Sequence, residues 1–176
     1  MTKLNIGKFF IIFIIMLLGG AMFCAVGFCS FVVPYAFFAA LLIYAGTLRT
    51  SIFAGSVSAL FLELMTGWST GTLVIPFLLA VMLLLFLEKR IRFVPLAFSN
   101  NKSPGYLVGL VLFSLVPYTC MLVGFFAIER FIYGETIEYS YTWIVHQLSY
   151  IPEFLLFTSV SLLLLSLAGS SHRSRI

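Results

Sequence analysis

Long apolar segments alternate with short polar segments along the whole of this chain. No charged residue occurs between Phe9 and Leu48, and these forty residues are enough for two membrane-spanning helices of about 20 residues each. Pro34, which closely follows Cys29 and Ser30, marks the turn between the two helices. The full pattern predicts one domain, residues 1–176, with six transmembrane spans at about 9–29, 33–48, 51–66, 72–87, 105–128 and 146–168.

The composition places these segments in a lipid bilayer rather than in the core of a soluble domain. Hydrophobic residues make up 62% of the chain and charged residues only 9%, whereas soluble domains carry about 25% charged residues. The first apolar segment is longer than the roughly 7 to 15 residues of a signal-peptide core, and a second one follows at once. We therefore expect a retained first span and an all-α polytopic membrane protein, a bundle of six transmembrane helices.

The basic residues fall almost entirely on one side of the predicted membrane. If the N-terminus is cytoplasmic, nine of the ten basic residues lie in the cytoplasm and Arg130 alone lies outside. Cytoplasmic connections of multi-pass proteins are enriched in lysine and arginine. The bias therefore predicts that both termini are cytoplasmic, and an odd number of spans would destroy it. The nine residues are Lys3, Lys8, Arg49, Lys89, Arg90, Arg92, Lys102, Arg173 and Arg175.

The third span carries a row of small residues that ends in an acid. Gly55, Ala59 and Glu63 are four residues apart, so they share one face of a helix. Small residues let a second helix approach closely, and we therefore expect this span to pack centrally. The turn Gly67-Trp68-Ser69-Thr70-Gly71 follows. Pro76 then lies in the first turn of the fourth span, where its missing N–H has little cost.

Glu63 and Arg49 each have a functional and a structural interpretation. An acid within an apolar span usually faces the bundle interior or a water-filled cavity, where Glu63 could contact a ligand, an ion or a partner. Alternatively, its carboxylate lies near the outer interface and is capped by Thr66 or by backbone N–H groups of the 67–71 turn. Arg49 either pairs with a lipid phosphate or a partner carboxylate, or it anchors the cytoplasmic end of its span.

Other polar residues in the apolar segments indicate structure rather than chemistry. Pro117 predicts a kink in the fifth span, and Pro152 lies near the outer end of the sixth. His146 and Glu153 share a helix face, but a metal or proton site would need further ligands, and none occurs at a suitable spacing. The sequence has no phosphate-binding loop, dinucleotide fingerprint or metalloprotease motif. We expect no catalytic residue, metal, cofactor, nucleic-acid partner or small-molecule ligand.

The order of features around the third span matches a known family. A span that begins with proline ends in Tyr44-Ala45-Gly46-Thr47-Leu48-Arg49, and the next span closes with Leu60-Phe61-Leu62-Glu63. A glycine-containing turn to Gly71 and a further apolar helix follow. This order resembles the MreD family of rod-shape-determining membrane proteins. In that family a tyrosine-containing span with a basic end precedes Gly-Leu-x-x-Asp, a short turn and a glycine.

The resemblance covers residues 33–92, and the last span, with Pro152, is also similar to the proline-containing last helix of that family. Two positions differ. Ala59 or Leu60 stands where the family often has glycine, and Glu63 stands where it often has aspartate. The resemblance implies a six-helix fold related to the substrate-binding subunits of energy-coupling-factor vitamin transporters.

The same resemblance implies a function. It would make the chain a non-enzymatic scaffold of the cell-wall elongation machinery in the bacterial inner membrane. This machinery guides peptidoglycan synthesis and maintains rod cell shape. The implied protein partners are MreC, the actin-like MreB, RodA and a penicillin-binding transpeptidase. The lipid bilayer is a further partner.

Two other functions compete with the scaffold. A vitamin-type, small-solute binding subunit of a membrane transporter is the alternative, because the same fold class binds vitamins. Trp68, Tyr118, Trp143 and His146 could then line an outward-facing pocket, whereas in a scaffold they would be belt residues at the membrane interface. An intramembrane enzyme has less support, because no paired catalytic groups lie at matched depth.

Overall fold

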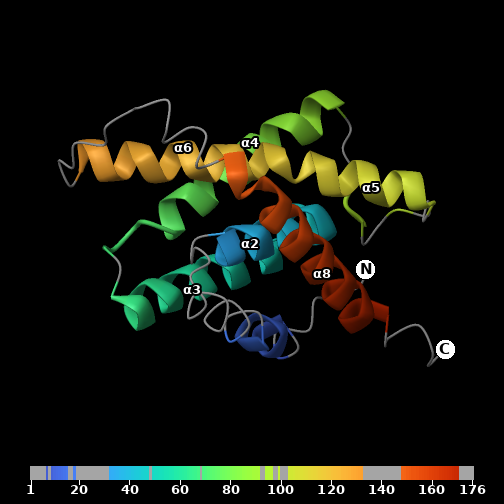
Figure 1. The fold of residues 1–176 in the computed structure, drawn as a ribbon, viewed down its shortest axis with the longest axis horizontal. Coiled ribbons are helices and arrows are strands. Elements are labelled where there is room, and N and C mark those ends of the chain that lie inside the picture. The colour runs from blue at the N-terminus through green and yellow to red at the C-terminus, as the bar shows by residue number, and fades with distance from the viewer. Residues whose placement is uncertain are drawn as a thin grey trace.

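The computed structural model is predominantly helical in the part of the chain that it describes, which comprises residues 7, 9–15, 18, 32–47, 49–67, 69–91, 94–96, 99, 103–132 and 148–170. No strand occurs in these ranges, and the all-α class predicted from sequence is therefore confirmed for them. The helices are α2 (Val32–Ala45), α3 (Arg49–Thr66), α4 (Val74–Ile91), α5 (Pro104–Phe113), α6 (Leu115–Phe131) and α8 (Ile151–Ser170), arranged as Figure 1 shows. Residues 9–15 and 18 are also helical, and the other residues of the predicted first span lie outside the described residues.

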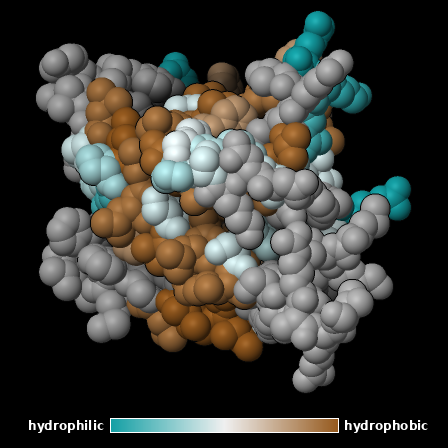
Figure 2. Space-filling view, turned by 90° about the vertical axis from the view of Figure 1, so that its right-hand side faces the viewer, coloured by the Kyte–Doolittle hydropathy of each residue, from teal (hydrophilic) through white to brown (hydrophobic). Residues whose placement is uncertain are grey.

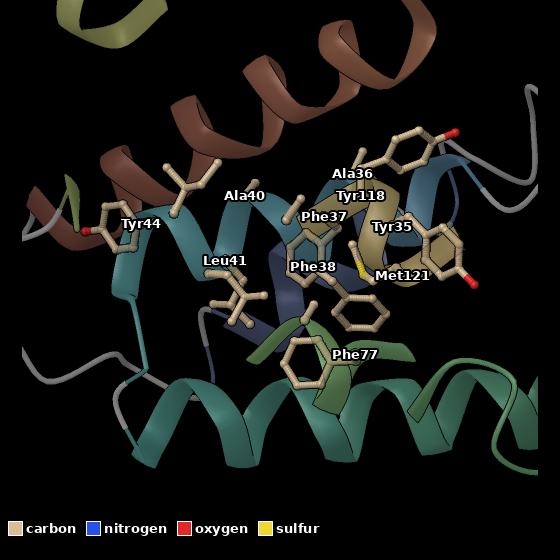
Figure 3. Packing of buried hydrophobic residues seen from close by; sticks show 14 of the residues in the cluster. Tyr35, Ala36, Phe37, Phe38, Ala40, Leu41, Tyr44, Phe77, Tyr118 and Met121 are labelled. Atoms are coloured by element: carbon tan, nitrogen blue, oxygen red, sulfur yellow. The ribbon is translucent and has the colours of Figure 1, made fainter. Parts of the chain in front are cut away.

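Helix α2 forms the core of the molecule. All fourteen of its side chains are buried, and its largest contact is with α8, followed by α6, α3 and α4. Figure 3 shows α2 between α8 and α3, with the ring of Phe38 5.0 Å from that of Phe77 on α4. A helix that is apolar on every side is typically buried on every side. The composition of α2 therefore accounts for its central position.

Helix α3 lies at the edge of the bundle, so the prediction that the third span packs centrally is wrong. Phe53, Leu64 and Met65 on its outer side are 65%, 72% and 72% exposed. The small residues Gly55 and Ala59 are buried, and the helices that α3 contacts are chiefly α4 and α2. The small face therefore allows close packing on one side, and the large apolar side chains on the opposite side are exposed.

The fifth predicted span is interrupted, and the interruption lies one turn before the proline. Helix α5 ends at Phe113 and α6 begins at Leu115, with Ser114 between them. Pro117 has no N–H to donate to the carbonyl of Phe113, and its ring crowds that carbonyl. The Ser114 N–H donates to both Leu110 and Val111, each at 3.1 Å, which is a tighter, bifurcated arrangement. The interruption thus adjoins Phe113, whose carbonyl receives no helical hydrogen bond from Pro117.

Helix ends depart from the predicted boundaries where a glycine or a turn intervenes. Helix α2 ends at Ala45 rather than 48, because Gly46 adopts a φ of 64°, and a left-handed residue commonly terminates a helix. Helix α4 begins at Val74 rather than 72, because residues 70–73 form a turn. Against α4, Gly124 of α6 lies so close that a Cβ there would be 3.2 Å from the Cα of Pro76.

The outer surface of the molecule is largely apolar. Figure 2 shows hydrophobic residues over much of the coloured surface, with hydrophilic residues towards its upper and right-hand edges. Soluble monomers rarely expose continuous apolar patches larger than a few hundred Å². The exposed large apolar side chains come from every outer helix and include Phe53, Leu64, Met82, Phe86, Val108, Val123, Leu156, Leu163 and Leu167.

One helical segment of the described chain is long and apolar enough to cross a membrane, Pro104–Ile128. It includes the interruption at Ser114. Val32–Ala45 and Ile151–Leu167 are apolar as well but shorter. Length and composition therefore associate the protein with a membrane, whereas the number of spans and the side on which the termini lie remain matters for the proposal below.

Candidate functional site

The candidate site is the α3–α4 hairpin, and at its centre the Glu63 carboxylate binds three backbone N–H groups. Oε2 accepts from Gly71 at 2.9 Å, while Oε1 accepts from Leu73 at 2.6 Å and from Val74 at 2.9 Å. The first N–H groups of a helix have no partner within that helix, and a negative charge is favourable at this end. Glu63 therefore caps the start of α4 from the preceding helix, and its side chain is only 3% exposed.

Two glycines shape the turn that brings these donors to Glu63. Gly67 has a φ of 70° directly after the last residue of α3, and Gly71 has a φ of 100°. Residues with a side chain rarely adopt such angles. Gly67 thus ends α3, and Gly71 turns the chain so that its own N–H points at the carboxylate. Thr72 tightens the same turn, because its hydroxyl donates to the Ser69 carbonyl at 2.8 Å.

The small face of α3 meets α4. A Cβ added at Gly55 would lie 2.3 Å from Cζ of Phe77, so the Phe77 ring occupies the space that a side chain at residue 55 would need. Ala59, one turn further along, is completely buried. The helix that approaches the small face is therefore the next one in sequence, joined to it through the turn that Glu63 holds.

The opposite end of the hairpin is held by a contact that sequence reasoning missed. The Thr47 hydroxyl donates to Oε2 of Glu88 at 2.8 Å, which ties the segment between α2 and α3 to the last turns of α4. The Ser51 hydroxyl donates to the Gly46 carbonyl at 2.9 Å. A Cβ at Gly46 would lie 2.5 Å from Cγ of Pro95. Glu88 lies 41 positions from Thr47, and no local sequence pattern pairs the two residues.

The structure brings some of the predicted residues together and separates others. Gly55, Ala59, Glu63 and Gly71 all belong to the α3–α4 contact, and Gly67 ends α3. Pro76 is buried in the first turn of α4, against α6. Arg49 is exposed at the start of α3, at the opposite end of that helix from Glu63. Pro152 is exposed in the first turn of α8, which is not part of the hairpin.

The residues proposed for a transporter pocket are only partly described. Tyr118 is buried in the core, where its ring stacks on Phe154 at 4.0 Å and meets Tyr35 edge-on at 6.4 Å. Trp68, Trp143 and His146 lie outside the described residues. Tyr118 therefore contributes to packing between α6, α8 and α2, as Figure 3 also shows for its position beside Tyr35.

Both oxygens of the Glu63 carboxylate are engaged by backbone donors, so the arrangement positions a helix rather than activating a reactant. Among the described residues, which include neither histidine, no three His, Cys, Asp or Glu side chains form a group that could hold a metal ion. Over the described residues, fold and site together define a helical bundle in which a buried acid caps a helical hairpin. Comparison with protein-family models, curated proteins and solved structures finds no match to the chain.

Proposed function

We propose that this protein is a non-enzymatic scaffold of MreD type, embedded in the bacterial inner membrane as part of the cell-wall elongation machinery. One observation carries the proposal. The residues on which the resemblance rests, an acid that closes one helix and a glycine that precedes the next, are joined directly by the hydrogen bond from Gly71 to Glu63. The acid and the glycine of the motif thus belong to one folded unit, in which the Gly71 N–H donates to the Glu63 carboxylate.

The character of the surface supports insertion in a bilayer. Large apolar side chains are exposed on α3, α4, α5, α6 and α8, and lipid is the surrounding in which such a surface has no cost. The helical segment Pro104–Ile128, at 25 residues, is about 38 Å long at 1.5 Å per residue, which is enough to cross the roughly 30 Å of a hydrocarbon core. In this proposal the chain crosses the membrane six times, with both termini in the cytoplasm.

The chemistry of Glu63 supports a structural rather than a catalytic role. This carboxylate is buried, and three N–H groups already bind it. A general base must be free to accept the proton of a substrate. The function that remains for the α3–α4 hairpin is to present a fixed surface to other proteins of the membrane, of which an MreC-like protein is the first to test.

The test is depletion of this protein in the rod-shaped bacterium that encodes it. Loss of a scaffold of elongation should make the cells round, and the wild-type chain supplied in trans should restore rods and co-purify with an MreC-like protein. A Thr119→Ala variant serves as a matched control, because this exposed hydroxyl donates within its own helix, to the Val116 carbonyl. Cells that stay rod-shaped after depletion would overturn the proposal, and a vitamin-type solute retained on the purified protein would favour the transporter subunit instead.

A further inference from the structure

Three exposed basic residues lie at the end of the hairpin where Thr47 is bonded to Glu88. Arg49 begins α3, and Lys89 and Arg90 lie in the last turn of α4. The 2.8 Å hydrogen bond from Thr47 to Glu88 places these two helix ends side by side, since each basic residue is within two positions of a bonded residue. All three side chains are exposed. We call Arg49, Lys89 and Arg90 the basic corner.

The acid nearest to the basic corner points away from the surrounding solvent. Glu88 is half-buried, because its Oε2 accepts from Thr47 and its Oε1 lies 3.1 Å from the position that a Cβ of Gly46 would occupy. The positive charges of three exposed side chains are therefore offset by one described carboxylate, which is half-buried. The basic corner presents a net positive charge outward, and an anion is the partner that complements it.

The surroundings of the basic corner select among anions. Each helix has an exposed phenylalanine one turn from its basic residue, towards the middle of the helix. Phe53 follows Arg49 on α3 and is 65% exposed, and Phe86 precedes Arg90 on α4 and is 58% exposed. The guanidinium of Arg90 lies over the Phe86 ring, 5.7 Å from its centroid. Each helix thus shows a cation at its end and an apolar ring one turn along, which matches a phosphate headgroup followed by an acyl chain.

We propose that the basic corner binds an anionic phospholipid, with the headgroup phosphate at Arg49, Lys89 and Arg90 and the acyl chains along Phe53 and Phe86. The inference rests on the membrane insertion in the proposed function but not on the role in cell shape. It extends that function by giving the scaffold a preference for lipid composition. Juxtamembrane cations act on anionic lipid within about one Debye length, and exposed side chains at a helix end satisfy that condition.

The experiment titrates the full-length protein in detergent with phosphatidylglycerol and with phosphatidylcholine of identical acyl chains, and measures bound lipid by native mass spectrometry. The wild type should bind phosphatidylglycerol more tightly. Each cation contributes about fivefold in affinity, so the single variants Arg49→Gln, Lys89→Gln and Arg90→Gln should each lose about that factor. The triple variant should no longer distinguish the two lipids, and added salt should reduce the preference of the wild type.

Arg130→Gln is the matched control, since Arg130 is also exposed near a helix end but lies in the last turn of α6, at the far end of the α5–α6 segment. It should leave the lipid preference unchanged. The inference is overturned if the triple variant keeps the preference, if Arg130→Gln reduces it equally, or if glycerol phosphate without acyl chains competes as well as the lipid. Lipid preference is measured on purified protein, so its failure is distinguishable from a failure of the cell-shape test.

Discussion

The ring of Phe77 on α4 lies directly against the backbone of Gly55 on α3, at a distance that leaves no room for a side chain at residue 55. A Cβ there would be 2.3 Å, 2.8 Å and 3.0 Å from three ring carbons. This contact sets how closely the two helices of the hairpin approach. The hydrogen bonds of Glu63 two turns further along depend on the same approach, because the residue faces α4 from the same side of α3.

Replacing Gly55 by alanine should therefore destabilise the protein. Alanine gains up to about 1 kcal/mol of helix propensity, but overpacking a tight contact costs about 1 to 3 kcal/mol. The free energy of unfolding, measured by denaturant titration in detergent, should fall. Gly109→Ala is the control, since nothing lies within 4 Å of a Cβ at that position, and it should be neutral or stabilising. Equal stability of the two variants would contradict the packing described here.

Replacing Glu63 should weaken the turn in proportion to the acceptors that are lost. Glutamine keeps one oxygen for Leu73 and Val74 but turns its NH2 towards the N–H of Gly71. Leucine leaves all three N–H groups without the carboxylate, and each buried group without a partner costs about 1 to 3 kcal/mol. The free energy of unfolding should decrease from wild type to Glu63→Gln to Glu63→Leu.

The ordering for Glu63 has a useful comparison within the chain. Glu153→Gln alters an acid whose buried Oε1 has no hydrogen-bond partner among the described residues, so this variant should change stability less than Glu63→Gln does. A Glu63→Leu protein that unfolds like the wild type would show that the capping arrangement contributes nothing.

The contact between Thr47 and Glu88 should show coupling in a double-mutant cycle. Thr47→Val removes the donor while keeping the shape of the side chain, and Glu88→Leu removes the acceptor. A hydrogen bond to a charged group contributes about 1.5 to 3 kcal/mol. The two changes together should cost less than the sum of each alone, as measured by unfolding in detergent. Strict additivity would mean that the bond does not hold the end of the hairpin.

The proposed topology places the two ends of α4 on opposite sides of the membrane. In a chain without native cysteines, a cysteine at Ser69 should react with an impermeant reagent added outside intact cells, and so should one at residue 136, which lies outside the described residues. A cysteine at Leu96 should react only after the cells are opened, because α4 separates it from Ser69. Labelling of Leu96→Cys from outside would exclude six spans with cytoplasmic termini.

The sequence predicts the helices well and their arrangement poorly, for a physical reason. Charges, glycines and prolines mark where a helix ends, and the turn between Gly67 and Gly71 follows from such marks. In an apolar chain almost every face of every helix is hydrophobic, so periodicity does not show which face is buried. The central position of α2 and the peripheral one of α3 therefore could not be derived.

Contacts between distant parts of the chain are likewise invisible in local patterns. The sequence raised the possibility that backbone N–H groups of the turn bind Glu63, because the turn follows within a few residues. Two of the three donors, Leu73 and Val74, nevertheless lie beyond the predicted turn. The bond between Thr47 and Glu88 spans 41 positions, and only the packing of α4 beside the end of α2 brings its atoms together.

The burial of α2 also has a consequence for the order of assembly. A chain is synthesised from its N-terminus, so α2 is made early and α8 after all the other described helices. Because α8 covers α2 more extensively than any other described helix does, the largest interface among these helices forms only when synthesis has passed residue 170. A ribosome-bound chain that ends before Ile151 therefore holds a central helix that still lacks α8, the described helix with which it packs most.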